Sequence, residues 1–249
     1  MLISNSFFCC GFRLTTFHIC IPLGSIKLSY HLFLHNHIIL LVFHNKAYLG
    51  NLGYNTHLVN LPLTHKHINK ATKMFKKQLQ QISKQYSKNT KFHIVGHSTG
   101  GLVILNYLRH PVKEISIDRC VQIATPNKGS QLADIAFNYL PFIFKNYKTL
   151  NDIQTEKTNI PKNSLINNKI GAIAGNKSNS IYSIIIKGDD DGRISIDSVK
   201  IPALEDFLIL PYGHKEIHHK KKTAKYIHNF LEYGKFEPKK RLKTKDIIN

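Results

Sequence analysis

The most constraining feature of this sequence is the pattern Gly-x-Ser-x-Gly over residues 96–100, which lies between two apolar stretches of different period. Residues 91–95 are typical of a short strand, and residues 102–108 are apolar on most sides, as in a buried helix. When a chain passes from strand to helix within a few residues, the middle residue is strained, and side chains two positions before and after it would clash. The segment therefore predicts a strand–turn–helix that presents Ser98 at the carboxyl end of a sheet.

Ser98 in such a turn is a candidate nucleophile. Thr99 opens the predicted helix, so its backbone N–H is expected to point at negative charge that develops beside the serine. The alternative interpretation is a glycine-rich turn that contains a serine by chance. The strand and helix on either side, together with the additional Gly101, favour the nucleophile.

A serine nucleophile needs a histidine base and a carboxylate that orients the base, and in this kind of turn they follow in the order serine, carboxylate, histidine. Three consecutive aspartates, 189–191, come directly after a β-branched run at 181–186 that we interpret as a strand. Asp191 precedes Gly192, as expected of a sharp turn that aims one carboxylate inward, and Asp190 is its main rival. A calcium loop starting at Asp189 is rejected because Lys200 occupies the position of the bidentate glutamate.

The base is sought among the histidines that follow the next predicted strand, residues 207–210. His214 is favoured because the turn 211–213 leaves it on a loop at the carboxyl edge of the sheet. His218 and His219 lie farther on, near the start of a closing helix. A metal site built from these three histidines is the alternative, but no acidic residue has the spacing of a zinc protease motif. We therefore expect neither a metal nor an organic cofactor.

The rest of the chain predicts alternating strands and helices around this motif. Such alternation is typical of a mostly parallel central sheet with helices on both faces, an α/β fold. We place the domain at residues 38–234 and interpret 131–180, where apolar clusters alternate with polar connections, as a small cap or lid insertion. The further predicted strands are 38–43, 56–61 and 115–124, and the further predicted helices are 65–86 and 223–233.

The two ends of the chain are less informative. Residues 1–37 form an apolar segment without clean periodicity, and residues 235–249 form a basic tail. No apolar run near the start approaches the ~20 residues of a membrane span, and no convincing signal peptide precedes it, so a cytoplasmic location is expected. The formal net charge of +20 favours anionic partners. An anionic membrane, contacted at its surface, is one such partner. The absence of any nucleic-acid-binding motif argues against nucleic acid as another.

Four segments resemble the lipase and esterase branch of the α/β-hydrolase superfamily. They are the turn 52–56, the nucleophile turn 93–103, the Thr-Pro-x-x-Gly-Ser pattern at 125–130 and the acidic loop 188–198. One departure matters. The family usually has a His-Gly pair and a loop of about ten residues or more after its first core strand, and this loop donates an oxyanion N–H. Here His44-Asn45 takes that place and the first helix is shortened or absent.

The resemblance implies hydrolysis of a small-molecule or lipid ester by a Ser98–His214–Asp191 triad through an acyl-enzyme. Thr99 N–H and Asn45 N–H are the implied oxyanion donors. Two alternatives stay open. One is a catalytically impaired hydrolase fold that acts as a membrane- or partner-binding module, motivated by the altered loop at residue 45. The other is an acyltransferase that uses the same residues.

Overall fold

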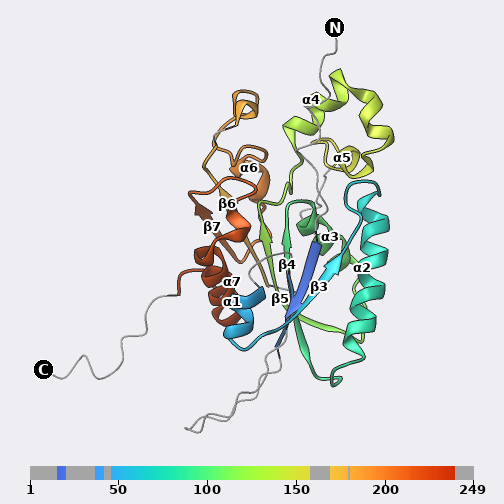
Figure 1. Ribbon diagram of the computed structural model, residues 1–249, viewed down its shortest axis with the longest axis vertical. Coiled ribbons are helices and arrows are strands. Elements are labelled where there is room, and N and C mark those ends of the chain that lie inside the picture. Colours follow the sequence, from blue (N-terminus) through green and yellow to red (C-terminus); the bar gives the residue numbers. More distant parts are fainter. Residues whose placement is uncertain (1–15, 21–36, 42–45, 158–168, 179, 239–249) are drawn as a thin grey trace, which may run out of the picture.

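The computed structural model describes residues 16–20, 37–41, 46–157, 169–178 and 180–238 of the 249-residue chain (Figure 1). Strands and helices alternate along most of this length. The residues form one twisted sheet covered by helices on two sides, with a group of short helices at one end (Figure 1).

The central sheet has seven strands among the described residues, in the order β1-β3-β2-β4-β5-β6-β7. The strands from β2 to β7 pair in parallel, and β1 pairs antiparallel with both β3 and β2. The mostly parallel sheet predicted from the alternation of strands and helices is thus confirmed. The strands are β1 (Thr16–Cys20), β2 (His37–Leu41), β3 (Asn55–Asn60), β4 (Lys91–His97), β5 (Ser116–Ile123), β6 (Lys169–Gly175) and β7 (Asp206–Leu210).

Four helices cover the two faces of the sheet. α2 (Ile68–Ser83) and α3 (Thr99–Arg109) pack together on one face, and α1 (Lys46–Asn51) and α7 (Lys221–Tyr233) pack on the other (Figure 1). The predicted helices are therefore found, and α1 is the shortened first helix. α2 and α7 each bury a stripe of apolar residues at three- and four-residue spacing, as Phe75 and Leu79 do in α2.

Aromatic rings fill the core on both sides of the sheet. Phe75 meets Tyr107 edge to face, with ring centroids 5.2 Å apart, and this contact joins α2 to α3. On the opposite face Phe230 and Phe236 stack at 4.9 Å. Gly171 of β6 lies beneath these two rings, so the absence of a side chain there lets the rings approach the sheet.

The predicted strand at 181–186 is wrong. Residues Ile181–Ile184 form a short 3₁₀ helix, η2, and Ile184 is 89% exposed. The sheet strand is β6 instead, which lies inside the segment assigned to the cap. Its sequence, Lys-Ile-Gly-Ala-Ile-Ala-Gly, is rich in residues that are poor strand formers by themselves. At Gly171, between β5 and β7, the Phe230 and Phe236 rings leave no room for a β-branched side chain.

The predicted cap segment, 131–180, therefore also contains a strand of the sheet, and we keep the name cap for the elements before β6. Its described elements are α4 (Gln131–Tyr139), η1 (Pro141–Lys145) and α5 (Lys148–Asp152). They lie at the carboxyl end of the sheet (Figure 1). Two short elements complete the fold, α6 (Ile196–Val199) and η3 (Ile217–His219).

We predict that Gly171→Ala destabilises the chain. The added Cβ would lie 2.6 Å from Phe236 Cζ and 2.7 Å from Phe230 Cε2, so the rings or the strand must shift. Overpacking of this kind typically costs about 1–3 kcal/mol in the free energy of unfolding, which urea titration measures. Gly50→Ala is the matched control, because a Cβ at this α1 position has nothing within 4 Å. Equal unfolding midpoints for the two variants would contradict this account of β6.

Candidate active site

Ser98 occupies the turn between β4 and α3 in a strained conformation. Its φ of 51° and ψ of −131° are rare for a residue with a side chain, and such strain costs on the order of 1–3 kcal/mol. The Ser98 N–H donates to the carbonyl oxygen of Ile123 at 2.8 Å, which holds the turn against β5. A Cβ on Gly96 would lie 2.8 Å from the Gly100 carbonyl carbon. The predicted strand–turn–helix and the need for these glycines are therefore observed.

Gly101 sets the position of α3 relative to the loop after β5. A Cβ at Gly101 would lie 1.9 Å from Thr125 Oγ1, so only glycine lets the first turn of α3 pack directly on Thr125. Thr125 itself is fully buried, and Ala124 before it has a positive φ of 48°. The second strained position therefore lies next to the first, at the carboxyl ends of neighbouring parallel strands.

Three side chains from distant parts of the chain meet at this turn. Ser98 Oγ lies 3.1 Å from His214 Nε2, and His214 Nδ1 lies 2.8 Å from Asp191 Oδ2. Ser98 follows β4, Asp191 lies in the loop before α6, and His214 follows β7. His214 is 6% exposed and Asp191 is 3% exposed. The structure thus brings together the three residues that the sequence singled out.

The Asp191 carboxylate is held so that one oxygen faces His214. Its Oδ1 accepts the backbone N–H groups of Ile194 at 2.8 Å and Arg193 at 3.1 Å, which leaves Oδ2 for the imidazole. The backbones are joined as well, since His214 N–H donates to the Asp191 carbonyl at 2.7 Å. Burial lowers the pKa of the Arg193 guanidinium, and the neighbouring Asp191 carboxylate opposes that shift.

The other two aspartates of the acidic loop, Asp189 and Asp190, make no hydrogen bond with His214 among the described residues. Asp190 Oδ1 accepts from Ser183 Oγ at 2.7 Å and from the Gly192 N–H at 2.5 Å, so this carboxylate fastens its own loop. Asp189 is exposed. Among the three candidates, the carboxylate in contact with His214 belongs to Asp191.

Gly175, at the end of β6, was not singled out from the sequence, although it shapes the site. A Cβ there would lie 2.3 Å from the Tyr212 carbonyl oxygen and 2.8 Å from Asp191 Cβ. The loops that carry Asp191 and His214 can therefore converge only over a glycine. The prediction of a strand at 181–186 missed this role, because it leaves Gly175 inside the predicted cap segment.

His97 is a second residue that the sequence analysis passed over. Its Nε2–H donates to the carbonyl oxygen of His214 at 2.9 Å, and the two rings lie 4.7 Å apart. His97 is buried, and this burial lowers its pKa well below the usual value; nearby His214 and His218 add to the shift. A neutral His97 therefore holds the backbone of His214 in place through this hydrogen bond. Its place inside the motif, directly before Ser98, was the available signal.

A buried amide pair lies beneath the turn. Gln122 Nε2 donates to the Gly101 carbonyl at 2.9 Å, and Asn127 Nδ2 donates to the Val199 carbonyl at 2.8 Å. The two amides also bond to each other, with Asn127 Nδ2 at 2.9 Å from Gln122 Oε1. This network joins α3, the loop after β5 and the end of α6. Gln122 interrupts the otherwise apolar run 120–124, and this was the signal for it in the sequence.

Of the two predicted oxyanion donors, Thr99 and Asn45, the described residues include only Thr99. Thr99 is the first residue of α3 and is nearly buried, so its N–H is one of those that an α-helix leaves without an internal partner. It lies next to Ser98 at the positive end of the helix dipole. Asn45 lies outside the described residues, and α1 begins at the next residue.

The described residues contain neither a metal-binding cluster nor a helix that could span a membrane. No group of three or more His, Cys, Asp and Glu side chains is arranged to hold a metal ion in the part of the chain that the structure covers. His218, named in the metal alternative, instead packs its ring 4.4 Å from that of His97 and 3.8 Å from that of His219. Among the helices described, none is both long enough and apolar enough to cross a membrane.

The parallel sheet and the strained serine turn after β4 define an α/β-hydrolase fold. Within that class, the chain belongs to the PGAP1-like alpha/beta domain family, whose model matches residues 54–187, more than half of the sequence. The matched region runs from the start of β3 through the serine turn and β6 to the acidic loop. No curated protein matches the chain.

Solved structures agree with this fold at low sequence identity. The mature form of the Bacillus licheniformis lipase BlEst2 superposes with a TM-score of 0.55 at 18% identity, over 73% of this chain and 79% of that one. The propeptide form of the same lipase gives a TM-score of 0.57 at 21% identity, over 73% of this chain and 43% of that one. Likeness at this level of identity establishes the shared fold.

We predict that the chain loses stability in mild acid, and that His97 contributes to the loss. Its pKa is lowered on folding, so below the unfolded value of 6.5 the unfolded chain binds a proton that the folded chain does not. The stabilising contribution is present above that pH and declines as the pH falls. His97→Gln cannot titrate and should lose less free energy of unfolding between pH 7.5 and pH 5.5 in urea titrations.

Exposed His110 provides the control variant, His110→Gln, for the effect of a His-to-Gln change at the surface. Burial also lowers the pKa of His228, so His97→Gln reduces the loss without abolishing it. A pH dependence identical in His97→Gln and the unmodified chain would contradict the prediction.

Proposed function

We propose that this chain is a serine hydrolase that cleaves carboxylic esters through an acyl-enzyme, as lipases and esterases do. The observation that most supports the proposal is the continuous run of contacts from Ser98 Oγ through the His214 ring to the Asp191 carboxylate. A nucleophile, a base and an orienting carboxylate in this order are the groups that acyl transfer requires.

In the proposed mechanism, His214 Nε2 takes the proton of Ser98 as Oγ attacks the ester carbonyl carbon. Asp191 keeps the remaining imidazole proton on Nδ1 and stabilises the imidazolium that forms. Thr99 N–H, with Asn45 N–H as the second proposed donor, stabilises the oxyanion of the tetrahedral intermediate. The intermediate collapses as its alkoxide leaves with the proton from His214. Water then attacks the acyl-enzyme with His214 as base, which releases the acid and restores Ser98.

The ester class rests on the fold and on the surroundings of the site. The mature and propeptide structures with the same fold are named as those of a lipase, and an ester substrate is proposed here by analogy with that name. The cap elements α4, η1 and α5 lie at the same end of the sheet as Ser98, where they would cover a lipophilic acyl chain (Figure 1). An acyltransferase would follow the same steps, with an alcohol replacing water.

The proposal is tested by labelling with a fluorophosphonate probe together with turnover of p-nitrophenyl esters of increasing chain length. We expect the unmodified chain to be labelled and to release nitrophenol, and Ser98→Ala to do neither. The chain-length profile then separates an esterase from a lipase. Absence of labelling in a folded sample would overturn the proposal in favour of a catalytically impaired module.

We predict that Asp191→Asn lowers kcat about 10⁴-fold, since the analogous change in a serine protease triad leaves the histidine in the wrong tautomer. Asp189→Asn is the matched control: the side chain is exposed, two residues away in the same loop, so turnover should stay near that of the unmodified chain. Both are measured with the p-nitrophenyl ester that gives the highest rate. Similar losses in the two variants would show that the carboxylate does not act through His214.

A further inference from the structure

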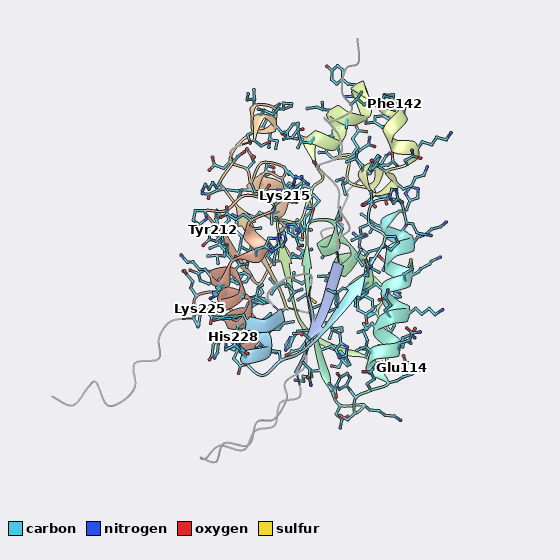
Figure 2. All side chains as sticks on the ribbon, viewed as in Figure 1. Glu114, Phe142, Tyr212, Lys215, Lys225 and His228 are labelled. Carbon is cyan, nitrogen blue, oxygen red and sulfur yellow. The ribbon has the colours of Figure 1, made fainter. Side chains whose placement is uncertain are left out.

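Large apolar side chains are exposed at one end of the molecule, in two short segments. Ile184 and Ile181 of η2 are 89% and 70% exposed, and Tyr139 and Phe142 of the cap are 77% and 71% exposed. Phe142 lies at the extreme of the end that carries the cap, far from Lys225 and Glu114 at the other end (Figure 2). We call these residues, with their exposed neighbours, the apolar rim: Phe137, Tyr139, Phe142, Ile181, Tyr182, Ile184 and Ile185.

The two halves of the apolar rim are joined at their bases beside the candidate site. The Lys187 N–H, just after η2, donates to Gln131 Oε1 at the start of α4 at 2.7 Å. On the other side, Ser183 of η2 donates to Asp190, the neighbour of Asp191. The rim therefore borders the loops that carry the site, and both halves lie beyond the carboxyl end of the sheet (Figure 1).

Basic residues adjoin the cap half of the rim on α2. Lys70, Lys73 and Lys77 of α2 are exposed and recur at steps of three and four residues, so they form a stripe along one face of the helix. Exposed Lys66 lies just before the helix and continues this spacing. The stripe begins next to the cap, since Thr149 Oγ1 of α5 donates to the Lys66 carbonyl at 2.6 Å. Those four lysines are absent from the ion pairs found among the described residues.

The whole first part of the chain lacks compensating negative charge. All 15 acidic residues lie at or after Glu114, so α2 and everything before it are free of carboxylate side chains. In the cap, where acidic residues do occur, Asp152 is bonded to Ile68 N–H and His67, and Asp134 to Thr155. The stripe therefore presents uncompensated positive charge beside exposed aromatic side chains.

We propose that the apolar rim and the α2 stripe together dock on an anionic phospholipid surface. Aromatic and aliphatic side chains that enter the lipid interface, next to lysines that contact headgroups, are the pattern of peripheral membrane binding. Docked in this way, the end of the molecule that carries Ser98 faces the lipid. For the chemistry, the inference rests on the proposed function: the substrate is then an ester that resides in the membrane.

The test of docking is flotation of the full chain as Ser98→Ala with vesicles of phosphatidylcholine alone or mixed with phosphatidylglycerol. We expect flotation with the anionic vesicles, which added salt weakens. Phe142→Ser and Ile184→Ser should each weaken binding by roughly ten- to a hundredfold, since burial of such a side chain contributes roughly 1.5–3 kcal/mol. Tyr233→Ser is the matched control, because Tyr233 is 60% exposed on α7, away from the rim. Equal losses in rim and control variants would overturn the proposal.

The lysine stripe is tested with the triple substitution Lys66→Gln, Lys70→Gln and Lys73→Gln. Lysines near an anionic membrane contribute about 1 kcal/mol each, so the three together should weaken binding roughly a hundredfold. The same substitutions at 221, 222 and 225 of α7 provide the control and should have little effect. If the α2 triple instead abolishes binding to a labelled oligoribonucleotide, and vesicles are not bound, the stripe is a nucleic-acid surface and the proposal is wrong.

Docking and catalysis are separated by the choice of measurements. Flotation of Ser98→Ala needs no turnover, so it reports on docking even where the proposed function fails. In chains that retain Ser98, the η2 variant Ile184→Ser should hydrolyse a short p-nitrophenyl ester normally and lose activity only on esters held in anionic vesicles. Turnover of the short ester without vesicle binding would overturn the docking proposal and leave the hydrolase proposal standing.

Discussion

The strained turn at Ser98 is the constraint on which the rest of the site depends. A positive φ at a serine is unfavourable, and it persists because the elements on both sides are fixed independently. β4 is an inner strand, and nearly every residue of α3 is buried against the sheet and α2. The hydrogen bond from Ser98 N–H to Ile123 and the close packing of Gly101 on Thr125 then leave one conformation for the turn.

The residues around Ser98 are positioned mainly by backbone contacts. The backbone of His214 is held by two hydrogen bonds: its N–H donates to the Asp191 carbonyl, and its carbonyl accepts from the His97 ring. Two backbone N–H groups fix the Asp191 carboxylate. Few of these groups retain freedom to rotate. A site built in this way keeps its geometry before a substrate arrives, which lowers the reorganisation needed during a reaction.

Sequence periodicity predicted most of the fold because most elements bury one face. α2 and α7 show this at helical spacing, and β4 shows it as a buried, mostly apolar run before the serine turn. It failed where local preference and tertiary environment disagree. The β-branched residues of η2 lie exposed beside the site, whereas the glycines and alanines of β6 lie in the sheet. There the Phe230 and Phe236 rings leave no room for a side chain at Gly171, and the Tyr212 and Asp191 loops leave none at Gly175.

The sequence by itself determined the position of the serine turn, because a strand, two obligatory glycines and a helix are encoded within about twenty residues. It also narrowed the carboxylate to Asp191 or Asp190 and favoured His214, from their order and the turns around them. Only the tertiary structure decided that Asp191, and not Asp190, contacts His214, and that Gly175, His97, Gln122 and Asn127 surround the site. These contacts join residues up to 117 positions apart, and no local pattern records the distance between such segments.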